Sequence, residues 1–238
     1  AQALVDRLGV DAAPLVDAMD HPALAWRRAG LMAVTGRPDG PPLVCPAALA
    51  SAADGALIAL RGLAPDPAAL PANGALLLGE RARLMGLPRG GRLSANGSCR
   101  LLDAEDGRIA LNLARDDDWD LMPVLLGGTV AREWDAVAGQ VAVRKVADLI
   151  ALGIELGLPI AEDRASAAET PFTLLQESEA GAAPRRRAPL VVDFAALWAG
   201  PLAASLLGMM GADVVKVESV SRPDGARFGH AGFYDLLN

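Results

Sequence analysis

The sequence has few of the residues that several common classes of protein require. Of its 238 residues only Cys45 and Cys99 are cysteines, which is too few for a disulfide framework and gives no metal-binding spacing. Aromatic residues make up only 4%, so the core must be aliphatic. The net charge of −7 argues against general nucleic-acid binding, because neutralising phosphates requires a basic surface.

Long apolar runs are also missing. No run reaches the ~18 residues of a membrane-spanning helix, and the chain has no basic start followed by an apolar region and a cleavage site. We therefore expect a soluble, cytoplasmic protein without a membrane segment and without a metal site. What is present is a chain that is 52% hydrophobic, mostly Ala, Leu and Val, which is typical of a globular protein of one or two domains.

The clearest local pattern lies near the end of the chain. Leu190–Phe194 is a short apolar run of the kind that forms a buried parallel strand, and Asp213–Glu218 is a second one. Between them apolar residues recur at helical spacing, with Pro201 at the expected first helical position and Gly211 as the stop. This order predicts a right-handed βαβ unit whose ligand binds over the carboxyl ends of the strands.

The βαβ pattern alone leaves two interpretations open. One is a nucleotide-like ligand near Trp198–Pro201, and the other is a core α/β unit with no ligand at this turn. The dinucleotide fingerprint G-x-G-x-x-G is absent, since only Gly200 lies in the turn. Glu218 could bond a ribose, but a polar residue at the end of a strand is common.

The stretch VVDFAALWAGPLAASLLGMMGADVVKVESVSRPDGARFG resembles the opening segment of the class III (CaiB/BaiF-type) CoA-transferases. That segment reads V-L-D-L/F, then A-G-P, a helix, L-G-A-D-V-I-K-V-E and G-D-x-x-R. The resemblance implies a Rossmann-like CoA-binding domain. Its turn would hold the nucleotide end of CoA through backbone amides and the helix start, and consists of Leu197, Trp198, Ala199, Gly200 and Pro201.

The resemblance also implies positive charge close to this turn. The family often has an arginine soon after the strand glutamate, whereas Ser219 stands there in this chain. Arg222 and Arg227 could supply the charge instead, since guanidinium groups suit phosphate. Alternatively, Arg227 only pairs with Asp224 on the surface. Trp198 could pack on the adenine or pantetheine of CoA, or equally belong to the core.

A second stretch, AGLMAVTGRPDGPP, resembles the middle of the same family. The catalytic aspartate of the family would fall on Leu49 or Ala50, and neither can act as a nucleophile. Asp54 lies one helical turn further on, so we expect a capping or surface role for it. We therefore expect no catalytic residue in this chain. His21 falls near a histidine of the racemase branch, but Pro22 follows it instead of aspartate, which favours a turn histidine.

The stretch SCRLLDAEDGRIALNLARDDDWDLM resembles the small domain of the family. It predicts two strands, 99–102 and 109–113, around a turn at Asp106 and Gly107. The run Asp116–Asp118 is placed to cap a helix and not to bind a metal, because successive helical positions point apart. Residues 134–157 predict one or two amphipathic helices.

Together these patterns predict an α/β fold with a Rossmann-like βαβ segment and a helical and small α+β segment. We expect residues 1–160 to be the middle and small-domain-like part without the catalytic aspartate, residues 161–188 a linker, and residues 189–238 the incomplete start of a CoA-binding domain. This order indicates a tandem, fused or permuted arrangement. A lone βαβ unit exposes sheet edges, so we expect the residues to be part of a longer chain.

The resemblance implies a CoA-transferase that moves CoA between an acyl-CoA and a carboxylic acid. In such enzymes an aspartate attacks the acyl thioester, the CoA thiolate then gives an aspartyl-CoA thioester, and the acceptor carboxylate takes the CoA. We expect a homodimer with CoA as substrate and the nucleophile outside these residues. Two alternatives are a 2-methylacyl-CoA racemase, which needs a histidine and aspartate pair, and a non-catalytic CoA-binding partner subunit.

Overall fold

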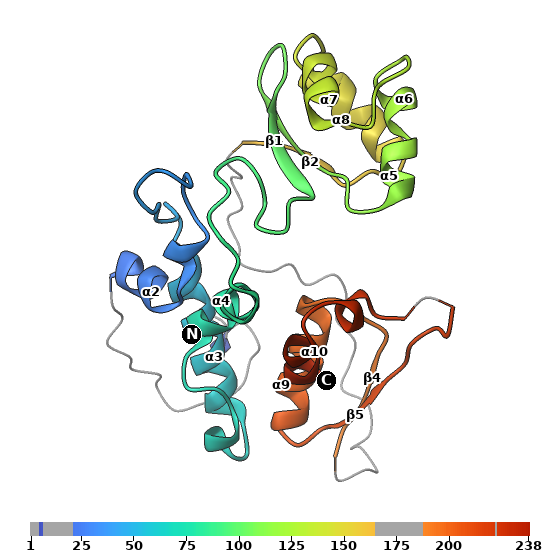
Figure 1. Cartoon of the computed structure of the whole chain (residues 1–238). Helices are drawn as coiled ribbons and strands as arrows, with labels where there is room; N and C mark the ends of the chain where they lie inside the picture. The colour runs from blue at the N-terminus through green and yellow to red at the C-terminus, as the bar shows by residue number, and fades with distance from the viewer. Residues whose placement is uncertain (1–4, 7–20, 165–187, 222) are drawn as a thin grey trace. The chain divides into compact units, whose positions relative to one another are not determined.

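The computed structural model describes residues 5–6, 21–164, 188–221 and 223–238 (Figure 1). The fold is mixed α/β, as the sequence predicted. The described residues cluster into two compact units. Unit 1 takes in those of Ala1–Thr35, Pro42–Pro88 and Glu179–Asn238, and unit 2 those of Gly36–Pro41 and Arg89–Ser178. The predicted boundaries at residues 160 and 189 stay a prediction.

The first part of unit 1 is helical. Its elements are α2 (Pro22–Arg28), η1 (Leu31–Ala33), α3 (Leu49–Leu63), η2 (Pro67–Ala69) and α4 (Gly74–Met85). Helix α2 stops at Arg28 because Gly30 has a left-handed backbone with φ 73°. The helices pack closely, since a Cβ atom on Gly79 of α4 would lie 2.0 Å from the carbonyl oxygen of Ala29.

Unit 2 contains a small antiparallel sheet. Strand β1 (Cys99–Asp103) pairs with β2 (Arg108–Asn112), which confirms the hairpin predicted at Asp106 and Gly107. The sequence did not predict the third strand, β3 (Ile160–Glu162), which pairs with β2. Two short helices, α5 (Asp116–Asp120) and α6 (Met122–Leu125), follow the hairpin.

Two longer helices, α7 (Trp134–Val141) and α8 (Val146–Glu155), complete unit 2 (Figure 1). The sequence predicted one or two helices in residues 134–157, and the structure has two. The buried core of this unit is aliphatic, with Ile109, Leu111 and Val137 fully covered.

Two aspartates of unit 2 cap helices. Asp118 is buried and accepts hydrogen bonds from the backbone N–H of Arg115 (2.9 Å) and from its guanidinium group (2.6 Å). Asp106 accepts a 2.8 Å bond from the N–H of Val146 at the start of α8. Within the described ranges no cluster of three or more acidic, histidine or cysteine side chains could hold a metal. The capping role predicted for the aspartate run is therefore observed at Asp118.

The second part of unit 1 is the βαβ segment. It consists of β4 (Leu190–Asp193), α9 (Ala199–Met209) and β5 (Asp213–Lys216), followed by η3 (Gly225–Phe228) and α10 (Ala231–Leu237) (Figure 1). The two strands are parallel, as predicted. Helix α9 begins two residues earlier than expected, so that Pro201 is its third residue, and Gly211 ends it with φ 97°.

The strand pair leaves apolar side chains uncovered. Val192 of β4 and Val214 and Val215 of β5 are exposed, and no other described strand pairs with either one. A pair of parallel strands usually lies inside a larger sheet that is covered on both faces. The expectation that these residues belong to a longer chain stays a prediction. None of the described helices is both long and apolar enough to cross a bilayer.

Candidate functional site

A buried cluster of charges lies at the carboxyl ends of β4 and β5. The parallel register places Asp193, the last residue of β4, beside Lys216, the last residue of β5. The Nζ atom of Lys216 lies 3.4 Å from Asp193 Oδ2 and 3.2 Å from Asp224 Oδ2. The side chains of Lys216, Asp193 and Asp224 are 15%, 6% and 0% exposed, so this is a three-membered ion pair shielded from water.

The cluster holds the turn between β4 and α9. Asp193 Oδ1 accepts a 2.7 Å bond from the N–H of Ala195, while the ammonium group of Lys216 donates to the carbonyl oxygen of Ala195 at 3.1 Å. Asp224 Oδ1 accepts bonds of 2.9 Å from the N–H groups of Leu197 and Ala226. The turn is thus tied both to the sheet and to the loop that follows β5.

The same bonds set the charge of Asp224. Burial raises the pKa of this carboxyl group, but the N–H groups of Ala226 and Leu197 and the ammonium group of Lys216 outweigh the effect. The net result is a pKa below the ordinary value of 3.8, so Asp224 stays ionised at neutral pH. A charged, buried acceptor therefore fixes the backbone of the turn.

The turn is tight and locally strained. Leu197 has φ 72°, and it is the one non-glycine residue with positive φ in the part of the chain that the structure describes. A side chain in this region of backbone space costs ~1–2 kcal/mol. Gly200 is needed for close packing, because a Cβ atom there would lie 2.1 Å from the Cβ of Ala195. Strain of this kind is common at ligand-binding turns.

Two backbone donors are left open where α9 starts. No described residue accepts a hydrogen bond from the N–H of Ala199 or Gly200, and Pro201 has no N–H. The first intrahelical bond runs from the N–H of Leu202 to the carbonyl oxygen of Trp198, at 2.9 Å. The start of an eleven-residue helix also carries a partial positive charge, so these amides are suited to bind an anion.

Glu218 is fully engaged with neighbouring side chains. It accepts a 2.6 Å bond from Arg227, a 2.8 Å bond from the N–H of Asp224 and a 3.1 Å bond from the hydroxyl of Tyr234. The Arg227 guanidinium, followed by the N–H of Asp224, lowers the pKa of Glu218 from 4.5 to about 2. The guanidinium carbon of Arg227 also lies 4.2 Å from the ring centre of Tyr234.

Of the two arginines predicted to contact CoA, Arg227 can be compared with this geometry. The described partner of Arg227 in an ion pair is Glu218, and not Asp224 as the surface alternative supposed. Arg222 lies outside the described residues. The role predicted for both arginines in binding CoA stays a prediction.

Trp198 lies at the edge of a mostly apolar hollow in unit 1. It is half-buried and packs against the cluster formed by Ala226, Phe233 and Leu237. The hollow has a volume of about 260 Å³, and α4, α9 and α10 contribute its walls. The backbone of the candidate turn is therefore bonded to the charged cluster, whereas the side chain of Trp198 lines an apolar hollow.

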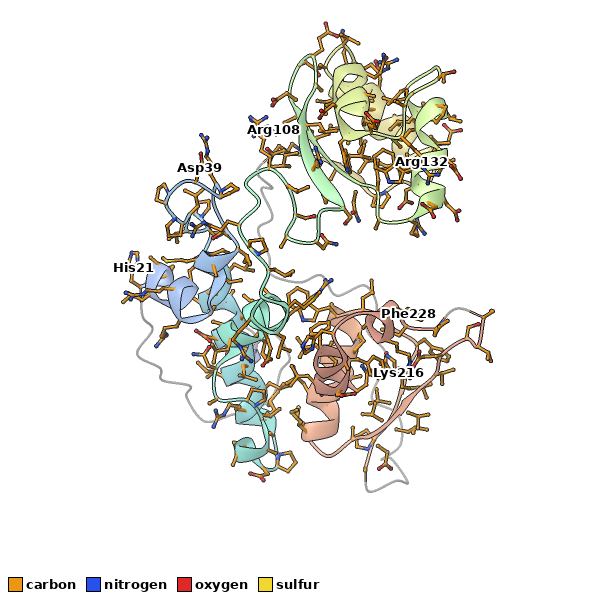
Figure 2. The ribbon with its side chains drawn as sticks, in the orientation of Figure 1. His21, Asp39, Arg108, Arg132, Lys216 and Phe228 are labelled. Atoms are coloured by element: carbon orange, nitrogen blue, oxygen red, sulfur yellow. The ribbon has the colours of Figure 1, made fainter. Side chains whose placement is uncertain are left out.

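The positions aligned with the family nucleophile carry no carboxylate, and the histidine aligned with a family base caps a helix. Leu49 is the first residue of α3 and 49% exposed, and Ala50 is buried. The carboxylate of Asp54 accepts a 2.7 Å bond from the N–H of Ala75, the second residue of α4, which is the capping role expected for it. His21 is exposed at the start of α2 and caps it by accepting a bond from the N–H of Ala23 (Figure 2).

The sequence did not single out the residues that hold the turn. These are Asp193, Lys216 and Asp224, together with Tyr234, which helps to hold Glu218. A signal did exist, since each predicted strand contains a charged residue, Asp193 or Lys216, at the position where the observed strand ends. Charges at equivalent ends of neighbouring parallel strands must meet each other or be solvated.

Comparisons with known proteins agree with the sequence motifs. The model of CoA-transferase family III matches residues 189–236, which span β4, α9, β5 and most of α10. Among solved structures, the crystal structure of a CAIB/BAIF family protein from Brucella suis is similar, with 16% sequence identity and a TM-score of 0.44. The similarity covers 69% of this chain and 58% of that protein, so this chain spans little more than half of that protein's length. No curated protein matches. Residues 189–236, the segment that contains the charged cluster and the candidate turn, are thus similar to CoA-transferase family III.

Proposed function

We propose that the turn Leu197–Pro201 binds the phosphate groups of CoA, and that the chain serves in the transfer of CoA between an acyl-CoA and a carboxylic acid. The observation that carries the proposal is the pair of open amides, at Ala199 and Gly200, inside the segment that matches CoA-transferase family III. Backbone amides at a helix start are a common anion-binding device.

The surrounding residues favour an anion at this position. The bonds from Asp193 and Asp224 hold the turn, so little ordering is required when a ligand binds. Pro201 at the third helical position needs no partner for a missing N–H. Arg227 and Arg222 are the candidates for further phosphate contacts. For Arg227 such a contact would compete with Glu218 or share the guanidinium group with it.

The chemical step requires a nucleophile from outside these residues. In the transferase mechanism a carboxylate is acylated and then becomes a CoA thioester, and Leu49 and Ala50 offer no such group. We propose that the nucleophile is supplied from beyond the described residues and that the enzyme is a homodimer. The alternative is a CoA-binding subunit without catalysis, which the apolar residues at the start of α3 favour.

A substitution at the turn separates CoA binding from folding. Ala199→Asp places a carboxylate in the first turn of α9, where a negative charge stabilises a helix by ~0.3–1 kcal/mol. The same carboxylate repels a phosphate at the open amides. We expect a fold at least as stable as that of the wild type and a CoA affinity at least tenfold weaker by isothermal titration calorimetry, whereas Ala199→Asn retains most of the affinity. Equal affinity of the wild type and both variants for CoA would show that the turn does not bind its phosphates.

Mass spectrometry distinguishes the activities. Incubating the protein with an acyl-CoA and finding a hydroxylamine-sensitive CoA adduct on an aspartate would support transfer. Tight CoA binding without an adduct would support the non-catalytic subunit. No binding of CoA at millimolar concentration would refute both.

A further inference from the structure

Arg81 of α4 is a half-buried cation to which the described part of the chain supplies no counter-ion. Its guanidinium carbon lies 5.7 Å from the ring centre of Phe233, a buried residue of α10. Among the described residues no carboxylate pairs with Arg81, and the adjacent Glu80 pairs with Arg83 instead. An aromatic ring face compensates only part of the hydration that a guanidinium group loses on burial, so the position favours an anion.

Arg81 lines a small hollow of unit 1 that has room for such an anion. The hollow has a volume of about 60 Å³. At ~30 Å³ for each water-sized group, it holds about two such groups, which is the size of one compact oxyanion. A purine ring or a long apolar chain is too large for it.

The other walls of the hollow are open and supply a second donor. His230, an exposed residue between η3 and α10, lines it, and an imidazole ring carries an N–H group in either tautomer. The hollow is also lined by Gly225, where a Cβ atom would lie 3.1 Å from the Cδ2 atom of Leu197. None of the described residues that line it is acidic. The lining therefore attracts an anion and contains no carboxylate to repel one.

The hollow is distinct from the open amides at the start of α9. Leu197 lines the hollow, whereas Ala199 and Gly200 do not. A group bound in the hollow therefore contacts different donors from a group bound at these amides. Arg81 also lies outside residues 189–236, so the similarity to CoA-transferase family III assigns no role to it.

We propose that Arg81 and His230 form a second anion site, which binds one phosphate group. The planar guanidinium group can donate two hydrogen bonds to phosphate oxygens, and its contact with Phe233 restricts its orientation. The imidazole N–H of His230 can donate a third. The inference stands whether or not the turn binds CoA, because the two sites share no donor. A phosphate carried by a nucleotide and free inorganic phosphate offer the same chemistry, and the experiments below distinguish them.

The first experiment titrates the full chain with inorganic phosphate at constant ionic strength, followed by phosphorus NMR. Ala199→Asp is used as the background, because its carboxylate repels phosphate from the open amides. We expect saturable binding of one phosphate per chain in this background. Adding Arg81→Met keeps the apolar stem against Phe233 but removes the charge-assisted hydrogen bonds, so the affinity should fall about tenfold or more. Absent binding in Ala199→Asp, or binding unchanged by Arg81→Met, would overturn the inference.

Matched variants separate a built site from a general effect of charge. Arg83→Met removes a cation from the same helix, one that is 69% exposed and pairs with Glu80, and should leave the phosphate affinity within twofold. Arg81→Lys keeps the charge but not the fork and should lose affinity several-fold, as should His230→Ala. These two variants carry the test if urea unfolding shows that Arg81→Met does not fold. Equal losses in Arg83→Met and Arg81→Met would contradict a site at Arg81.

Calorimetry with CoA and with CoA that lacks the phosphate on its ribose identifies the source of the phosphate. If the site takes the ribose phosphate, the wild type should prefer CoA at least tenfold, CoA should displace inorganic phosphate, and Arg81→Met should abolish the preference. If it takes free phosphate, the two ligands should bind equally and inorganic phosphate should stay bound beside either one. Both results support the site. Displacement of inorganic phosphate equally by both ligands would assign it to the open amides and overturn the inference.

Discussion

Replacing Lys216 by methionine tests whether the buried charges hold the candidate turn. Methionine keeps the length and apolar stem of the side chain but removes the ammonium group that lies between Asp193 and Asp224. Two unit charges 3.2 Å apart attract by about 5 kcal/mol at an effective dielectric constant of ~20. The wild type already bears the cost of desolvating lysine, so the net loss is smaller than the sum of both attractions.

Removal of one partner from a buried ion pair typically costs ~3–5 kcal/mol, because the other charge stays buried without compensation. Asp224 is fully buried, so we expect Lys216→Met to lower the free energy of unfolding by about 3 kcal/mol. For a chain of this length that corresponds to about 6–12 °C in melting temperature. The double variant Lys216→Met/Asp224→Asn should recover part of the loss, because it removes the uncompensated charge.

The assay combines urea unfolding, followed by circular dichroism, with hydrogen exchange at the amides of Ala195 and Leu197. These amides donate to the two aspartates, so their exchange should accelerate in Lys216→Met. Arg37→Met is the control, because Arg37 and Asp39 form an ion pair in which both side chains are over 70% exposed, and such pairs contribute ~0–1 kcal/mol. If Lys216→Met were no more destabilising than Arg37→Met, the cluster would not hold the turn.

Further predictions concern the packing, charge and capping of unit 1. Gly200→Ala should destabilise by ~1–3 kcal/mol because its Cβ meets that of Ala195 at 2.1 Å, whereas Gly139→Ala in α7 has open space and should stabilise by ~0.5–1 kcal/mol, both measured by urea unfolding. Glu218 has a depressed pKa of about 2, so its contribution to stability is complete above pH ~4.5 and disappears as pH falls towards about 2. The stability difference between wild type and Glu218→Gln should therefore shrink over that range, and a difference independent of pH would contradict it. Asp54→Ala should cost ~1 kcal/mol in thermal unfolding through loss of a cap, and a loss of CoA binding at unchanged stability would refute a purely structural role.

The sequence predicted the parts of the fold that depend on local patterns. Two short apolar runs on either side of an apolar helical pattern predicted β4, α9 and β5. The Asp-Gly pair predicted the β1–β2 hairpin. The start of α9 was placed two residues late, because proline is tolerated throughout the first turn of a helix and does not mark its first residue uniquely.

Contacts between distant residues escaped prediction. Strand β3 has only three residues, too few to show a period, and it forms by pairing with β2 about fifty residues earlier in the chain. The bond between Asp224 and the N–H of Leu197 joins residues 27 apart, and no local propensity signals it. The left-handed backbone of Leu197 was equally hidden, because leucine disfavours it and only the surrounding bonds impose it.

One contact of the charged cluster, that between Asp193 and Lys216, could have been predicted from the sequence. Strands β4 and β5 each have four residues and each end in a charged residue, so a parallel register that matches their lengths brings Asp193 and Lys216 together. A lysine whose side chain is largely buried, as that of Lys216 is, is costly unless an acid lies beside it, which makes the pairing the expected solution. The third member, Asp224, stabilises the left-handed backbone of Leu197 by accepting a hydrogen bond from its N–H. The open amides at the start of α9 are therefore positioned by charges that lie in the strands and in the following loop, and not by the turn itself. Substitutions at Lys216 should for that reason weaken CoA binding even though its ammonium group faces the protein interior.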